Sequence, residues 1–194
     1  MTPPDEPTDA DLARQAAGGS ERAYAVLVGR HKDRLYGLLR RYLGDPEEAR
    51  EAAHEAFIAA WAALPRFDPA RPFGAWLRTI AINKARDRGR RLAFRRMIFG
   101  DRGLEDAGVH EHPDPEPDAE AALLDRERLA QLDRGIARLP TALKEALLLT
   151  AIEGLSQQEA AEILGVTVKT VETRIYRARK ALAQTLDPSL RPNR

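Results

Sequence analysis

The sequence contains no cysteine, which excludes a disulfide framework, a thiolate metal site and a catalytic thiol. It also has no apolar run long enough to span a bilayer, and its polar, acidic N-terminus lacks the cationic start and apolar stretch of a secretory signal. We therefore expect a cytoplasmic protein with no membrane insertion.

Signatures of catalysis are also missing. The chain has no phosphate-cradling glycine loop and no paired-carboxylate pattern typical of an enzyme cleft. The nearest approach to metal-ligand spacing is the tripeptide "HEH", but two imidazoles, His110 and His112, in a proline-rich stretch are weak evidence for a metal site. We therefore expect no catalytic residues, no cofactor and no bound metal, and we expect the protein not to be an enzyme.

The chain also has almost no net charge, because 31 lysines and arginines nearly balance 30 aspartates and glutamates. The two signs are nevertheless separated along the chain. Between residues 71 and 96 basic residues crowd around a single acid, Asp87, whereas the stretch 101–120 is acidic apart from Arg102. A basic density of this kind is costly unless an anion lies nearby, so the first stretch favours nucleic acid as a partner.

Strand patterns are nearly absent and helical spacing dominates, so we predict an all-α fold. One helix should run from the cap Ser20 to Gly44, a second should follow the cap Asp45, and a third should resume at Phe73 after the proline-rich stretch "LPRFDPARP". The pattern predicts two small helical domains joined by an acidic, flexible linker. The expected parts are a disordered N-terminal tail at 1–19, a first domain at 20–96, the linker at 97–121, a second domain at 122–186 and a C-terminal tail at 187–194.

The second domain contains a predicted helix-turn-helix. Ser156 and Glu159 form a capping box that starts a short helix, Gly165 ends that helix, and Thr167 can cap the next one. The second helix of such a motif can enter the major groove, where its arginines and threonines contact bases and phosphates. A basic helix alone is more often an ordinary solvated helix, but the capping box and the glycine turn favour DNA binding.

Four stretches together carry a family resemblance: "DPEEAREAAHEAFIAAWAALPRFD", "FGAWLRTIAINKARDRGRR", "ARLPTALKEALLLTAIEGLSQQEAAEILGV" and "TVKTVETRIYRARKAL". In this order and spacing they resemble the extracytoplasmic-function sigma factors of the sigma-70 family, the small two-domain initiation factors of bacterial RNA polymerase. The resemblance covers nearly the whole chain after Ser20. It implies as partners core RNA polymerase, through its clamp coiled coil and its flap, promoter DNA, and an anti-sigma factor.

The resemblance also implies three groups of site residues, carried over position by position. The first domain would contact the minus-ten element through Arg66, Phe67, Asp68, Arg78, Asn83, Lys84, Arg86, Asp87 and Arg90. The second would contact the minus-thirty-five element through Lys169, Thr170, Glu172, Thr173, Arg174, Tyr176, Arg177 and Lys180. The polymerase would contact Arg50, Glu51, His54 and Glu55.

Several of these side chains also have purely structural interpretations. His54 could be an ordinary exposed helix residue, Asn83 and Asp87 could make helix-surface or intramolecular contacts, and Tyr176 could pack against its own domain. Glu172 stands where the family often has a basic or small residue. A carboxylate there could accept a hydrogen bond from the exocyclic amine of cytosine, which would shift the promoter preference.

The expected function is that of a sigma factor, which binds core polymerase, directs it to specific promoters and helps to open the minus-ten region. The acidic linker has three readings: a solvated connector, an RNA mimic in the exit channel, or a mask over the basic helices. Neutralising Asp114, Glu116 and Asp118 would test the mask. Two other functions remain open: a helix-turn-helix regulator acting without polymerase, which leaves the first three helices unexplained, and a sigma-mimicking partner-switch protein, which should have lost the basic recognition surface.

Overall fold

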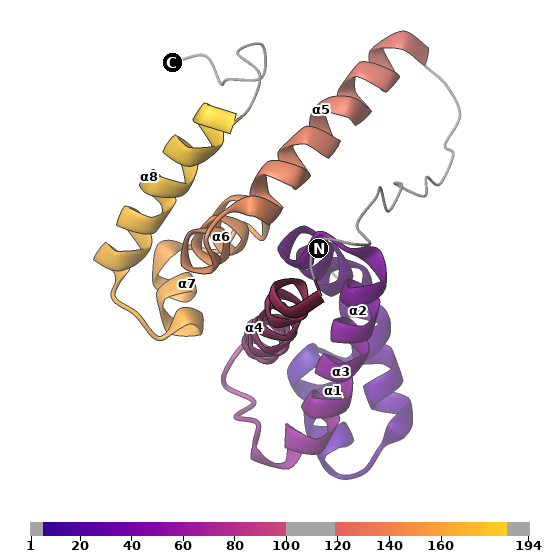
Figure 1. Ribbon diagram of the computed structural model, residues 1–194. Coiled ribbons are helices and arrows are strands. Elements are labelled where there is room, and N and C mark those ends of the chain that lie inside the picture. The colour runs from indigo at the N-terminus through magenta and orange to yellow at the C-terminus, as the bar shows by residue number, and fades with distance from the viewer. Residues whose placement is uncertain (1–5, 100–118, 186–194) are drawn as a thin grey trace.

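The structure is a computed structural model that describes residues 6–99 and 119–185 (Figure 1). Over these two ranges the chain is helical, with no strand, so the all-α prediction is confirmed. The elements are α1 (Asp9–Ala17), α2 (Glu21–Leu43), α3 (Pro46–Ala63), the 3-10 turn η1 (Leu64–Arg66), α4 (Phe73–Phe99), α5 (Ala119–Arg138), α6 (Thr141–Leu147), the π-helical turn η2 (Leu148–Ile152), α7 (Gln157–Leu164) and α8 (Val168–Thr185).

Local signals in the sequence explain where α2 and α3 begin and end. The side chain of Ser20 accepts a hydrogen bond from the amide of Ala23 and starts α2. Gly44 ends the helix with a φ of 78°, a left-handed conformation that residues with a Cβ rarely adopt. Asp45 then caps α3 by accepting from the amide of Glu48. These predicted boundaries are confirmed.

The prediction of a disordered tail over residues 1–19 is wrong for residues 9–17, which form α1. Thr8 and Asp11 make a capping box at its start, and Leu12, Ala13 and Ala16 are buried in the main hydrophobic core. A helix of nine residues is too short to be stable alone in water. Three apolar side chains on one face are enough to hold it because α2 already offers a surface to cover.

The second domain forms the predicted helix-turn-helix. The capping box of Ser156 and Glu159 starts α7, and Gly165 ends it at a φ of 65°. Thr167 then accepts from the amide of Thr170 at 3.2 Å and starts α8. One small buried cluster holds the motif together and comprises Ala146, Leu149, Ala160, Ala161, Leu164, Val171 and Ile175.

The two domains pack against each other. The main core joins residues of α2 and α4 with Ile136, Leu139, Leu147 and Leu148 from the second domain. In Figure 1 α7 lies beside α4. Among the described helices none is long and apolar enough to cross a membrane.

Candidate nucleic-acid interface

Helix α8 presents one buried face and one exposed basic face. Val171, Ile175, Ala178 and Leu182 are buried, as the helical spacing of the sequence predicts. Most of the candidate minus-thirty-five side chains lie on the remaining surface, and Tyr176 is 68% exposed, so its ring does not pack into its own domain. The helix therefore offers a continuous polar surface on the side away from its core.

Few of the α8 side chains are committed to contacts within the protein. Lys169 lies 3.4 Å from Glu172, and the hydroxyl of Thr173 donates to the carbonyl of Lys169 at 2.9 Å. Within the described parts of the chain, Arg174 and Arg177 make no ion pair, and the same holds for Lys180. Their charges are available to an anion.

Helix α4 carries the candidate minus-ten residues, and several of them are engaged by neighbours. Arg90 pairs with Asp87 one turn earlier, and Arg86 donates to the amide oxygen of Asn83 at 3.3 Å. Lys84 lies 4.0 Å from Glu55. Asn83, Asp87 and Arg90 are nevertheless exposed, so these side chains still face solvent on one side of the helix.

The loop before α4 is shaped by an aromatic cluster. The ring of Phe67 is buried, with its centroid 5.7 Å from that of Phe73 and 4.8 Å from that of Trp76. Phe67 therefore supports the loop from inside, whereas Arg66 and Asp68 are exposed beside it. The structure does not bring Phe67 to the surface with the other candidate minus-ten residues.

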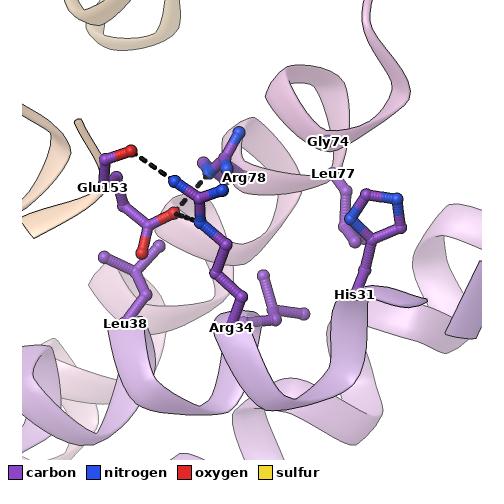
Figure 2. Close-up of a pocket in the computed structure, with 8 residues that line it drawn as sticks. His31, Arg34, Leu38, Gly74, Leu77, Arg78 and Glu153 are labelled. Atoms are coloured by element: carbon purple, nitrogen blue, oxygen red, sulfur yellow. Dashed lines mark hydrogen bonds and ion pairs between the residues drawn. The ribbon is translucent and has the colours of Figure 1, made fainter. Parts of the chain in front are cut away.

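Two arginines of the candidate minus-ten group are bound by buried acids of the second domain. Arg86 holds Glu145 with two hydrogen bonds, from Nε to Oε1 at 2.6 Å and from Nη2 to Oε2 at 2.7 Å. Arg78 donates from Nε to Oε2 of Glu153 at 2.8 Å. Arg34 of α2 donates to the same oxygen at 2.8 Å, and Figure 2 shows the two guanidinium groups converging on it.

The Glu145 contact perturbs the groups around it. Its hydrogen bond to Arg86 raises the pKa of that guanidinium above the usual range, so the arginine stays charged. Burial raises the pKa of the Tyr42 hydroxyl, and the negative charge of Glu145 raises this pKa further. The hydroxyl therefore stays protonated and donates to Oε1 of Glu145 at 2.9 Å.

Sequence reasoning missed both Glu145 and Glu153. The only signal was two acids within an otherwise apolar stretch, "LKEALLLTAIEGL", which predicts a core helix but says nothing about partners. Their arginine partners lie between 59 and 119 residues away along the chain. Contacts over such separations cannot be read from local spacing.

The candidate polymerase-binding residues divide into two pairs. Glu51 and His54 are exposed on α3. Arg50 pairs with Glu47, and Glu55 accepts from Nη1 of Arg88 at 2.7 Å. Of these four candidates, Glu51 and His54 are the two that have no salt-bridge partner within the described residues.

Some candidate features lie outside the described residues. These are the "HEH" tripeptide and the linker acids Asp114, Glu116 and Asp118. Among the residues that the structure does describe, no group of three or more potential ligands is placed to hold a metal ion.

Comparison with known proteins gives two family matches. Residues 27–95 match the model of sigma-70 region 2, and residues 129–182 match the model of sigma-70 region 4. The RNA polymerase sigma factor CnrH of Cupriavidus metallidurans is 44% identical, over 93% of this chain and 96% of that protein. The sigma-E factor of Haemophilus influenzae, an ECF sigma factor, is 32% identical over 93% of this chain and 96% of its own length.

Two solved structures are similar in fold. The structure of CnrH in complex with the cytosolic domain of CnrY matches with a TM-score of 0.66 and 38% identity, and the match covers 91% of this chain and 95% of that one. The sigma factor RpoE of Bartonella quintana, solved with the anti-sigma factor NepR, also gives a TM-score of 0.66, covering 88% of this chain and 98% of that one. Its identity of 21% makes this second match evidence for the fold alone.

Proposed function

We propose, from the premise that the chain belongs to the extracytoplasmic-function sigma factors of the sigma-70 family, that α8 and α4 read two separate parts of a promoter. As a member of this family the chain is an RNA polymerase sigma factor, which binds core polymerase and directs it to promoters. An ordinary helix-turn-helix regulator is not favoured, because the region 2 match covers the first three long helices, which such a regulator leaves unexplained.

The observation that carries the proposal for the second domain is the exposed basic face of α8. The capping box, the left-handed glycine and the buried stripe together fix this helix with its charged side outward. We assign the minus-thirty-five contact to this face, with Arg177 and Tyr176 toward the base edges and Lys169, Arg174 and Lys180 toward phosphates. Because Lys169 pairs with Glu172, we expect the acid to tune which bases are accepted rather than to abolish binding.

In the first domain we assign the minus-ten contact to α4 and to the loop before it. Asn83 and Asp68 are exposed and polar, and Arg78, Arg86 and Arg90 would hold phosphates of the separated strand. Capture of unstacked bases by the loop would offset an unstacking cost of roughly a few kcal/mol per base step. Strand opening by this route requires no bond chemistry from the chain.

The division of labour follows from this assignment. The chain supplies promoter recognition and strand capture in the cytoplasm, and core polymerase supplies nucleotide chemistry, so the chain itself is not an enzyme. We place the polymerase contact on α3, at Glu51 and His54, with Arg50 and Glu55 beside them. The functional units would be 20–96, with α1 packed onto them, and 122–186. The predicted linker at 97–121 is too long at both ends, because α4 runs to Phe99 and α5 begins at Ala119.

A protein regulator is the remaining partner. The similar structure of CnrH holds that sigma factor in complex with a second protein, the cytosolic domain of CnrY. We propose that an anti-sigma factor likewise controls this chain.

Transcription in vitro tests the proposed function. The protein would be added to sigma-free bacterial core polymerase with genomic fragments from its host, and the 5′ ends of the RNA would be sequenced. The expected result is a set of discrete start sites that share two upstream motifs. If no such starts form although the protein binds duplex DNA without polymerase, the proposed function is wrong.

A further inference from the structure

We infer that two buried carboxylates of the second domain form a latch that closes the free factor by occupying arginines of the first domain. The inference rests on the proposed function, because that function assigns Arg78 and Arg86 to promoter DNA. We call this contact the interdomain latch, and its members are Arg34, Tyr42, Arg78, Arg86, Glu145 and Glu153.

The first point of the latch is Glu145, which is 2% exposed. Both of its oxygens are used: Oε1 accepts from Arg86 at 2.6 Å and from the Tyr42 hydroxyl at 2.9 Å, and Oε2 accepts from Arg86 at 2.7 Å. The two parallel bonds from one guanidinium form a fork that fits a carboxylate or a phosphate equally well. While this point is closed, Arg86 cannot present that fork to DNA.

The second point is Glu153, which is 5% exposed and lies where η2 ends. Its Oε2 atom accepts from Nε of Arg34 and from Nε of Arg78, each at 2.8 Å. Its backbone carbonyl accepts a further bond from Arg34. Figure 2 shows that α2 and α4 each contribute one arginine to this single acid.

The arrangement of the charges suits a contact that opens. All the acids of the latch belong to one domain and all its arginines to the other, so separation of the domains releases both arginine groups at once. Removing one partner of a buried ion pair is strongly destabilising, because the other charge is left buried and unpaired, so loss of the two carboxylates should open the contact. Opening also uncovers the apolar contacts that Ile136, Leu139, Leu147 and Leu148 make with the first domain, so core polymerase must replace those contacts while DNA phosphates replace the carboxylates.

In this inference, the residues that mask the DNA-binding arginines of the first domain belong to the second domain. Arg78 and Arg86 are covered by Glu145 and Glu153, which are described residues, so their masking requires no contribution from the acidic linker. The exposed α4 residues Asn83 and Arg90 remain outside the latch. Free factor should consequently bind single-stranded DNA weakly, through an incomplete surface.

The first measurement is the distance between the domains of the full-length free factor. Because the chain has no native cysteine, dyes can be attached specifically to Lys32→Cys on α2 and Gln157→Cys on α7, both exposed positions. We expect Glu145→Gln/Glu153→Gln to lower the energy transfer between the dyes. The charge-matched control Glu21→Gln/Glu162→Gln, which alters two exposed acids outside the latch, should leave the transfer unchanged. Unchanged transfer in the latch variant would overturn the inference.

The second measurement is binding of the same free proteins to mixed-sequence single-stranded DNA. Apparent affinity scales with the fraction of molecules that are open, so the latch variant should bind about tenfold more tightly at low salt if about one wild-type molecule in ten is open. Adding Arg78→Gln/Arg86→Gln to the latch variant should abolish this gain. A gain that survives those substitutions, or none in an opened variant, would overturn the inference.

A milder variant guards against misfolding. The side chain of Arg34 is 57% exposed and lies outside the proposed DNA contacts, so Arg34→Gln should fold and open the latch partly, with smaller shifts in both measurements. If neither Arg34→Gln nor Glu145→Gln/Glu153→Gln changed the energy transfer or the DNA affinity, the latch would be refuted. Failure of wild-type factor to direct transcription would instead refute the proposed function, whereas normal wild-type transcription with no gain in the variants would refute only the latch.

Discussion

The two helices that we propose to contact DNA differ in how their cations are held. On α8, Arg174, Arg177 and Lys180 have no ion-pair partner within the described residues. On α4, Arg78 and Arg86 are bound to buried acids of the opposite domain. The structure thus leaves one proposed recognition surface open and engages two arginines of the other in ion pairs.

This difference matches what each surface is proposed to bind. A recognition helix meets duplex DNA, whose major groove is accessible without opening the strands. The minus-ten surface would be needed only when bases are extruded, which happens on the polymerase. Covering it in the free factor would restrict strand capture to the complex in which it is useful.

We expect the largest effect from a substitution in the buried cluster that supports α8. Leu149 is fully buried in the small cluster that holds the helix-turn-helix, so Leu149→Ala should cost about 2–5 kcal/mol and unfold the second domain first. Hydrogen exchange should rise in α7 and α8 while α2 and α3 stay protected, and duplex binding should be lost. As a control, Leu27→Ala should expose the first domain's amides. Equal exchange across both domains in Leu149→Ala would contradict the assignment of Leu149 to a cluster that supports only the helix-turn-helix.

A single substitution on α8 sharpens the comparison. Arg177→Ala should weaken binding of free factor to promoter duplex by about 1–3 kcal/mol, because this arginine is exposed and has no internal partner among the described residues. The matched control is Arg179→Ala, an equal charge change at an exposed position of the same helix outside the proposed contacts. Fluorescence anisotropy measures both. Equal losses would mean that charge alone, and not the proposed face, determines binding.

The turn between α7 and α8 should tolerate little change. Gly165 has a φ of 65° with open space around the position of a Cβ, so Gly165→Ala should cost about 1–2 kcal/mol through backbone strain alone. Gly165→Asn should cost less, since asparagine adopts this conformation more readily. Thermal unfolding would rank the three proteins. An alanine variant as stable as the wild type would show that the turn does not constrain α8.

The smallest expected effect concerns pH. Hydrogen bonds from Ser156 lower the pKa of Glu159, so the folded state holds this carboxylate charged more firmly than the unfolded state does. The capping contribution should be fully present above the ordinary pKa of glutamate and lost as pH falls through the lowered value. NMR titration of the α7 amides should show a step that Glu159→Gln removes. The same step in the variant would assign it to another group.

Local features of the sequence predicted most of the fold. The caps Ser20, Asp45 and Ser156 and the glycines Gly44 and Gly165 act on their immediate neighbours, so their effects can be read from spacing alone. The first helix escaped prediction although Thr8 and Asp11 supply a capping box, because a helix of nine residues is too short to be stable alone and depends on burial of Leu12 and its neighbours against α2.

The candidate site was less predictable. Spacing identified the basic surfaces, but it could not show that Phe67 turns inward or that Arg86 is held by Glu145. The loop around Phe67 has no helical period, so spacing cannot show which way the ring turns, although its partners Phe73 and Trp76 are near in sequence. The Arg86 contact depends on how distant helices pack, since an arginine that is exposed in an isolated helix can be engaged once a second domain covers it.

Site-specific photo-crosslinking tests the contrast between the two helices most directly. A photoreactive residue would replace exposed Asn83 on α4 or exposed Tyr176 on α8, and each protein would be irradiated with promoter DNA in the absence and presence of core polymerase. We expect position 176 to crosslink in both conditions and position 83 to crosslink strongly only with polymerase. Equal crosslinking at position 83 in the free factor would contradict the account.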